Sequence, residues 1–137
     1  MRIALAQLNP LVGDLAGNAA KILAACRKAT NQASDVVLTP ELSLWGYPPR
    51  DLLLRPLLIE QQNKILDEFA NTLYREAPTL STLIGIAEPI LDFQLPQLFN
   101  SVALIEKATW RVVARKQLLP TYDVFDEKRY FRPAKAP

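Results

Sequence analysis

Glu41 is the acidic side chain of this chain whose position best suits chemistry. It follows the apolar run 36–38, VVL, which is typical of a buried strand. A carboxylate just beyond the end of such a strand lies where open α/β sheets form their sites. The glycine at 46 and the prolines at 48 and 49 turn the chain, so no helix can follow Glu41 directly. The sequence therefore predicts a site-forming loop after this strand.

The composition excludes several other kinds of chemistry. The chain has no histidine, which excludes Ser-His-Asp and Cys-His catalysis and zinc sites that use histidine ligands. Its one cysteine, Cys26, cannot form an internal disulfide, and its four glycines form no phosphate-binding loop. Cys26 lies in a predicted helix beside Ala25 and Ala29. We therefore interpret Cys26 as a small core residue and not as a reactive thiol.

The charge of the chain predicts neither nucleic acid nor a membrane surface as a partner. Sixteen basic and fourteen acidic side chains give a net charge of only +2. No apolar run approaches the roughly 20 residues that span a bilayer, and the first strand pattern begins without a signal peptide ahead of it. We therefore expect a cytoplasmic chain. Its 137 residues, half of them hydrophobic, suit one domain with a real core.

Hydrophobic periodicity predicts five strands and two helices in the order β-α-β-α-β-β-β. The expected strands are 3–8, 35–39, 81–87, 99–105 and 110–114, and the expected helices are 18–32 and a long one that begins at Pro56 and ends before Pro78. Residues 106–109 predict a hairpin, and 9–17 and 88–97 predict loops. Crossover helices between strands imply an α/β sheet with helices on one face.

Three segments carry a resemblance to a known family. They are 2–10, RIALAQLNP; 40–53, PELSLWGYPPRDLL; and 115–131, RKQLLPTYDVFDEKRYF. Together they resemble the nitrilase (carbon–nitrogen hydrolase) superfamily, and within it the glutaminase domain of glutamine-dependent NAD synthetases. The resemblance runs from Arg2 to Pro137. The segments 40–53 and 115–131 are its two long motifs, and two such motifs in the right order are far more specific than one short pattern.

The resemblance implies a fold and a domain organisation. The family fold is a four-layer α-β-β-α sandwich, of which this α/β chain would form the N-terminal part, roughly the first half. Residues 1–137 would be a partial carbon–nitrogen hydrolase (glutaminase) domain without the synthetase domain. Because the sheet would be left incomplete, we expect the chain to associate, either as a homo-oligomer or with the missing half.

The resemblance also assigns roles, because nitrilase-type enzymes hydrolyse amides with Glu, Lys and Cys. Glu41 matches the general base, and Lys116 matches the group that stabilises the oxyanion. Glu127 matches a supporting acid, and Tyr122 matches a position that lines the glutamine pocket. The alternatives are a solvated loop residue for Glu41, a surface lysine for Lys116, an exposed ion-pair patch for Glu127 and simple packing for Tyr122. The family nucleophile lies beyond the segment that corresponds to 115–131, in a later part of the domain that residues 1–137 do not include.

Glutamine is the substrate that the resemblance implies. The parent enzyme hydrolyses glutamine and passes the ammonia to a second domain, which amidates deamido-NAD with ATP and magnesium. We expect this chain itself to hold no cofactor and no metal. Without the nucleophile we expect it to be inactive alone. The alternatives are a non-enzymatic interaction module, or a degenerate remnant, that docks on a full-length relative.

Overall fold

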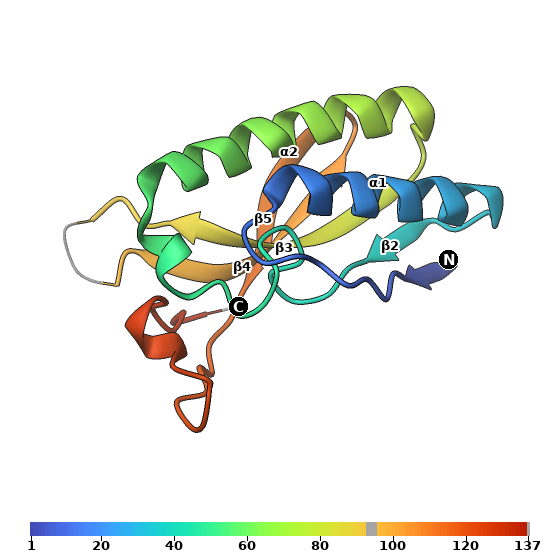
Figure 1. Ribbon diagram of the computed structural model, residues 1–137. Helices are drawn as coiled ribbons and strands as arrows, with labels where there is room; N and C mark the ends of the chain where they lie inside the picture. Colours follow the sequence, from blue (N-terminus) through green and yellow to red (C-terminus); the bar gives the residue numbers. More distant parts are fainter. Residues whose placement is uncertain (93–95, 137) are drawn as a thin grey trace.

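Both helices lie along the same face of one five-stranded sheet (Figure 1). The computed structural model describes residues 1–92 and 96–136. The elements are β1 (Ile3–Leu5), α1 (Leu15–Asn31), β2 (Val36–Leu38), α2 (Pro56–Glu76), β3 (Ser81–Pro89), β4 (Leu98–Glu106) and β5 (Thr109–Arg115), with short 3₁₀ helices at Arg50–Leu54 and Glu127–Arg129. This is the α/β order that the hydrophobic periodicity predicts.

The strands are neighbours in chain order, β1-β2-β3-β4-β5. The first three strands run parallel, because α1 and α2 return the chain to the same end of the sheet. Strands β4 and β5 run antiparallel to their neighbours, and a tight turn at Lys107 and Ala108, both with positive φ, joins them. The carboxyl ends of β2, β3 and β5 and the amino end of β4 therefore lie at one edge of the sheet.

The core lies between the two helices and the sheet. Both helices present apolar residues at helical spacing to it, and the buried members are Leu15, Ile22, Cys26 and Ala29 in α1 and Leu66, Phe69, Ala70 and Leu73 in α2. Helix α2 begins with Pro56 at its first turn, where the missing N–H costs nothing. No helix among the described residues combines the length and the apolar character needed to cross a membrane.

Gln62 is the polar exception in the buried stripe of α2, and its hydrogen bonds explain it. Its side chain is fully buried. Its Oε1 accepts from Trp45 Nε1 at 2.7 Å and from the Ala87 N–H at 3.0 Å, and its Nε2 donates to the Ala87 carbonyl at 2.8 Å. The buried amide is thus satisfied on both sides. Trp45, which makes the first of these contacts, is itself fully buried.

Cys26 is a core residue, as predicted. Its side chain is 1% exposed, and its Sγ lies 3.3 Å from Thr82 Oγ1 on β3. Burial raises the pKa of the Cys26 thiol, against the smaller opposing effect of the Thr82 hydrogen bond. A thiol held protonated in an apolar core is not a nucleophile.

The sheet face opposite the helices is apolar and exposed. Val37 of β2 is fully buried in the core, so Leu38 points to the other face, where it is 40% exposed. Leu5 of β1 pairs with Leu38 and so points to the same face, where it is 75% exposed. The helices thus cover only one side of this sheet.

Helix α1 begins at Leu15, three residues before the predicted start at Asn18. The Asp14 side chain accepts the Gly17 N–H at 3.0 Å and so caps the helix earlier. Asn18 lies inside the helix, 1% exposed, where its side chain binds the backbone of the preceding loop.

Two strand boundaries differ from the prediction by more than one residue. Strand β1 ends at Leu5 and not at residue 8, although the Ala6 N–H still donates to the Leu38 carbonyl at 2.9 Å. Strand β3 continues to Pro89, because its pairing with β4 extends to Leu98. The loop predicted at 88–97 is therefore shorter, and its residues 93–95 lie outside the described part of the chain.

Candidate active site

The turn that carries Glu41 lies directly on β3 at Gly85. A Cβ added at Gly85 would lie 2.3 Å from the Leu42 nitrogen and 2.9 Å from the Pro40 oxygen, both backbone atoms. Only glycine allows the turn to approach this closely. The Leu44 N–H also donates to the Gly85 carbonyl at 3.3 Å. Gly85 therefore allows the turn that carries Glu41 to pack directly against β3.

The residue after Glu41 has an unusual backbone. Leu42 has a positive φ of 47°, a left-handed conformation that costs a non-glycine residue on the order of 1 kcal/mol. Its side chain is fully buried, and its carbonyl accepts the N–H groups of Trp45 and Gly46 at 2.9 and 3.0 Å. Packing and hydrogen bonds thus hold a strained residue beside the candidate base, as is common at functional sites.

Glu41, Lys116 and Glu127 form one cluster. Lys116 Nζ lies 2.7 Å from Glu41 Oε1, although 75 positions separate the two residues, and 3.1 Å from Glu127 Oε1. The side chain of Glu127 is 5% exposed, whereas that of Glu41 is 45% exposed. The close approach of Glu41 and Lys116 that the sequence predicts is thus present. One cation lies between one buried and one accessible carboxylate.

The two carboxylates determine the charge of Lys116. Partial burial acts to lower the pKa of Lys116, but the hydrogen bonds and charges of Glu41 and Glu127 outweigh it and raise that pKa. Lys116 therefore stays an ammonium, which can stabilise a developing negative charge but cannot act as a base. Glu41, with a more accessible side chain, is the group of this cluster that can accept a proton from a bound molecule.

Asn100 joins this cluster from β4. Its Nδ2 donates to Glu41 Oε1 at 2.6 Å, and its backbone carbonyl accepts the Lys116 N–H at 2.8 Å. The residue is 5% exposed. Asn100 lies outside the three segments that carry the family resemblance, so the sequence does not indicate it as a site residue. The available signal was a pair of polar residues, Asn100 and Ser101, inside a mainly apolar strand that begins at Leu98.

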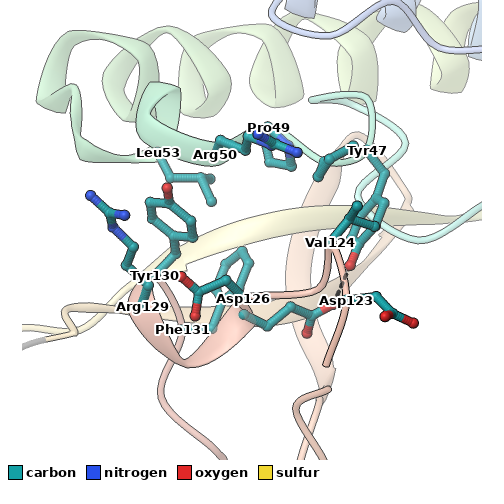
Figure 2. A pocket seen from close by; sticks show the side chains of 12 residues that line it. Tyr47, Pro49, Arg50, Leu53, Asp123, Val124, Asp126, Arg129, Tyr130 and Phe131 are labelled. Carbon is teal, nitrogen blue, oxygen red and sulfur yellow. Dashed lines mark hydrogen bonds between the residues drawn. The ribbon is translucent and has the colours of Figure 1, made fainter. Parts of the chain in front are cut away.

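Tyr47 reaches the cluster from the first motif. Its hydroxyl donates to Glu127 Oε1 at 2.7 Å, the dashed contact in Figure 2. Burial, followed by this hydrogen bond and the charge of Glu127, raises the pKa of Tyr47. Oε2 of Glu127 is buried and has no hydrogen-bond partner among the described residues. Such an unsatisfied acceptor is uncommon in a folded protein and is typical of functional sites.

Two cavities flank the cluster. The first, of about 350 Å³, is lined by Glu41, Asn100 and Lys116 together with apolar residues of β2, β3 and β4. The second, also of about 350 Å³, includes Glu127 in its wall. Volumes of this size are typical of small-molecule sites. The first cavity is the one that brings a bound molecule to both Glu41 and Lys116.

The second cavity lies between the two motifs that carry the family resemblance. Figure 2 shows side chains of the first motif facing side chains of the second across it; those labelled include Tyr47, Pro49, Arg50, Asp126, Arg129 and Tyr130. Tyr130 donates from its hydroxyl to Asp51 Oδ1 at 2.6 Å and so ties the two motifs together. The sequence motifs thus form adjoining walls of one site.

Tyr122 is the site candidate that the cluster does not include. It is 66% exposed and is not among the residues that line these two cavities. Its ring lies edge-on to Phe125 at 5.6 Å, and the Phe125 ring lies 6.1 Å from Tyr47. A role for Tyr122 in binding glutamine therefore stays a prediction.

Comparisons with known proteins place this geometry in a family. Residues 2–136 match the family described as carbon-nitrogen hydrolase. The glutamine-dependent NAD(+) synthetase of Synechocystis is 45% identical over 135 residues, which are 96% of this chain and 24% of that protein. The chain thus spans about a quarter of the length of the curated relatives that it matches.

Solved structures agree with this assignment. The glutamine-dependent NAD+ synthetase of Acinetobacter baumannii superposes with a TM-score of 0.85 at 35% identity, over 96% of this chain and 24% of that one. A variant of an amidase from Nesterenkonia superposes with a TM-score of 0.77 at 25% identity, over 100% of this chain and 49% of that one. The five-stranded sheet with its two helices therefore has the nitrilase fold, and the chain belongs to the carbon–nitrogen hydrolase family.

Proposed function

We propose that Glu41, Lys116 and Glu127 are the base, the oxyanion-stabilising cation and the supporting acid of a glutamine-hydrolysing amidase site. The observation that carries this proposal is the position of Lys116 Nζ, 2.7 Å from Glu41 Oε1 and 3.1 Å from Glu127 Oε1. A base and a fixed positive charge at one cavity are two of the three groups that amide hydrolysis requires. The third is a nucleophile.

In this reaction Glu41 takes the proton of a cysteine thiol, and the thiolate attacks the amide carbon of glutamine. Lys116 stabilises the negative oxygen of the tetrahedral intermediate. Glu41 then gives its proton to the leaving nitrogen, which departs as ammonia and leaves a thioester. Next, Glu41 activates a water molecule that hydrolyses the thioester to glutamate and returns the thiol. Glu127 keeps the ammonium of Lys116 in place through the 3.1 Å contact.

The nucleophile in this mechanism is not Cys26, because that thiol is buried and protonated in the core. Residues 1–137 contain no other cysteine. The chain alone is therefore expected to release no ammonia, and the nucleophile would come from a segment or partner outside these residues. In a mutant of the Nesterenkonia amidase, the acetamide moiety of fluoroacetamide is added covalently at the active site cysteine, which supports cysteine as the nucleophile.

The names of the relatives support glutamine as the substrate. The curated relatives are glutamine-dependent NAD(+) synthetases, and the site residues of this chain lie within the matched segment. We infer that the ammonia would serve amidation of deamido-NAD in a synthetase domain, with ATP and magnesium bound there. This chain would supply the first part of the glutaminase domain, and its contribution to the site would be the base Glu41, the cation Lys116 and the supporting acid Glu127.

A chimera tests this proposal. Residues 2–136 of this chain, which match the family, replace the corresponding segment of the Synechocystis relative, which is 45% identical to this chain over 135 residues. We expect the chimera to release ammonia from glutamine. Glu41→Gln keeps the size of the side chain but removes the base, and it should lower kcat/KM at least about 100-fold.

Glu106→Gln is the matched control. Glu106 is a carboxylate at the end of β4 that pairs with Arg111 at 3.7 Å, away from the cluster. The same change of charge at this position should leave the activity unaltered. Full activity in Glu41→Gln, or an equal loss in Glu106→Gln, would contradict the assignment of Glu41 as the base.

The second candidate function is an interaction module that docks on a longer relative and performs no chemistry. The observation that favours it is the exposed apolar sheet face, on which Leu5 is 75% exposed and Leu38 is 40% exposed. The chimera separates the two candidates. An inactive but folded chimera, together with binding of the native chain to the full-length relative in sedimentation, would favour the interaction module.

A further inference from the structure

Asn100 is a buried polar residue of the site that belongs to neither of the two motifs. It is 5% exposed, on a strand whose neighbouring residues Leu98 and Ala103 are buried apolar side chains. A polar side chain in such a place must be hydrogen-bonded, and Asn100 Nδ2 donates to Glu41 Oε1 at 2.6 Å. The strand thus presents one amide donor to the carboxylate that follows β2.

Asn100 contacts both principal members of the cluster. Its side chain holds Glu41, while its backbone carbonyl accepts the N–H of Lys116 at 2.8 Å. The second contact continues the pairing of β4 with β5 and does not depend on the side chain. A substitution at 100 can therefore remove the contact with Glu41 and leave the contact with the Lys116 backbone.

Glu41 Oε1 accepts two hydrogen bonds, one from Asn100 and one from Lys116. Within residues 1–92 and 96–136, both hydrogen bonds recorded for this carboxylate end on Oε1. A carboxylate oxygen with two donors is a poor acceptor for a further proton, so Oε2 is the oxygen left for the reaction.

We propose that Asn100 is a positioning residue that orients Glu41 so that its Oε2 faces the reacting molecule. The proposal rests on the proposed function in that it takes Glu41 as the base. The ion pair with Lys116 alone would hold the Glu41 carboxylate in one orientation only weakly. The Glu41 side chain is 45% exposed, and ion pairs between accessible side chains fix a geometry poorly. The buried amide adds a fixed donor that never loses its proton.

Acylation of Lys116 tests this role in the full chain. Asn100→Leu keeps a similar volume and removes the amide that donates to Glu41 Oε1. Without this hydrogen bond the Glu41 carboxylate should pair less tightly with the Lys116 ammonium. We expect Lys116 to react with acetic anhydride about tenfold faster relative to exposed Lys64, as measured by peptide mass spectrometry. The exchange rate of the Lys116 backbone N–H should stay unchanged, which a merely structural role for Asn100 would not allow.

Ser101→Ala is the matched control. Ser101 is the next residue, is 1% exposed, and donates from its hydroxyl to Glu88 Oε2 at 2.7 Å, outside the cluster. This variant should leave the ratio of Lys116 to Lys64 acylation unaltered. An unchanged ratio in folded Asn100→Leu, or an equal rise in Ser101→Ala, would overturn the proposal.

A second measurement needs no change at Asn100 and so covers the case in which Asn100→Leu does not fold. The chain is labelled with ¹⁵N at asparagine, and the side-chain amide of Asn100 is observed by NMR. In the native chain we expect a downfield amide proton that exchanges slowly with water. In Glu41→Ala the chemical shift of this proton should become that of a free side-chain amide, and the proton should exchange with water at least tenfold faster. No response to Glu41→Ala would refute the hydrogen bond and the proposal with it.

Neither readout depends on amide hydrolysis. A chimera that hydrolyses glutamine while Asn100→Leu leaves Lys116 acylation unchanged would refute the positioning role and keep the proposed function. An inactive chimera with the expected acylation change would refute the proposed function and keep the contact between Asn100 and Glu41.

Discussion

Gly85→Ala should displace the turn that carries Glu41. The added Cβ would lie 2.3 Å from the Leu42 nitrogen, and ordinary contact begins at 3.4 Å, so the backbone must move by about 1.1 Å. Overpacking of this kind costs about 1 to 3 kcal/mol, and a clash with backbone belongs at the upper end. Alanine also stabilises by restricting the unfolded chain, by about 0.4 to 1 kcal/mol. The expected net loss of unfolding free energy is therefore about 2 kcal/mol.

Urea unfolding followed by tryptophan fluorescence measures this loss, with Gly17→Ala as the matched control. A Cβ at Gly17 would lie 2.0 Å from Asp14 Oδ2, but that atom ends a flexible side chain that can move aside. Loss of the Asp14 cap costs about 1 kcal/mol, and alanine in a helix gains about as much. Gly17→Ala should therefore be nearly neutral. If Gly85→Ala is no less stable than Gly17→Ala, the close approach of the turn to β3 is refuted.

Three further predictions concern the thiol, the pH dependence and association. Cys26, 1% exposed, should react with a thiol reagent only when urea unfolds the chain; rapid labelling of the native chain would contradict its place in the core. Because burial and the Glu127 contact raise the pKa of Tyr47, the native chain keeps a proton that the unfolded chain loses above about pH 10. Stability should fall as the pH rises there, and Tyr47→Phe should make the fall shallower in urea unfolding at pH 9 and 11; an equally steep fall would refute this linkage. The exposed sheet face should cause self-association in sedimentation velocity that Leu5→Lys reduces, whereas a native chain that stays monomeric at every concentration would count against it.

The parts of the fold that periodicity predicts well are those with a local cause. Helix α2 starts at Pro56 and ends before Pro78, because proline marks both limits in the sequence. The predicted start of α1 at residue 18 is wrong because the turn-forming residues of 9–17 indicate a loop up to that point. The helix begins earlier because the Asp14 side chain accepts the Gly17 N–H and caps it.

The site shows the same division between local and distant causes. Glu41 and Lys116 each follow a strand within a long motif, so the sequence indicates both. Asn100 and Tyr47 act on partners 59 and 80 positions away, and no local pattern reports such pairs. Gly85 is a further example, because the need for glycine arises from a turn that approaches it from another part of the chain.

The most direct measurement of the central claim is ammonia release from glutamine by the chimera with Lys116→Met. Lys116 is the group that joins Glu41 and Glu127, and loss of one oxyanion-stabilising group typically costs about 100-fold to 1,000-fold in kcat. Lys107→Met, in the turn between β4 and β5, is the control and should leave the rate unaltered. We expect a loss of at least about 100-fold in Lys116→Met alone. Ammonia release at the native rate by Lys116→Met would contradict it.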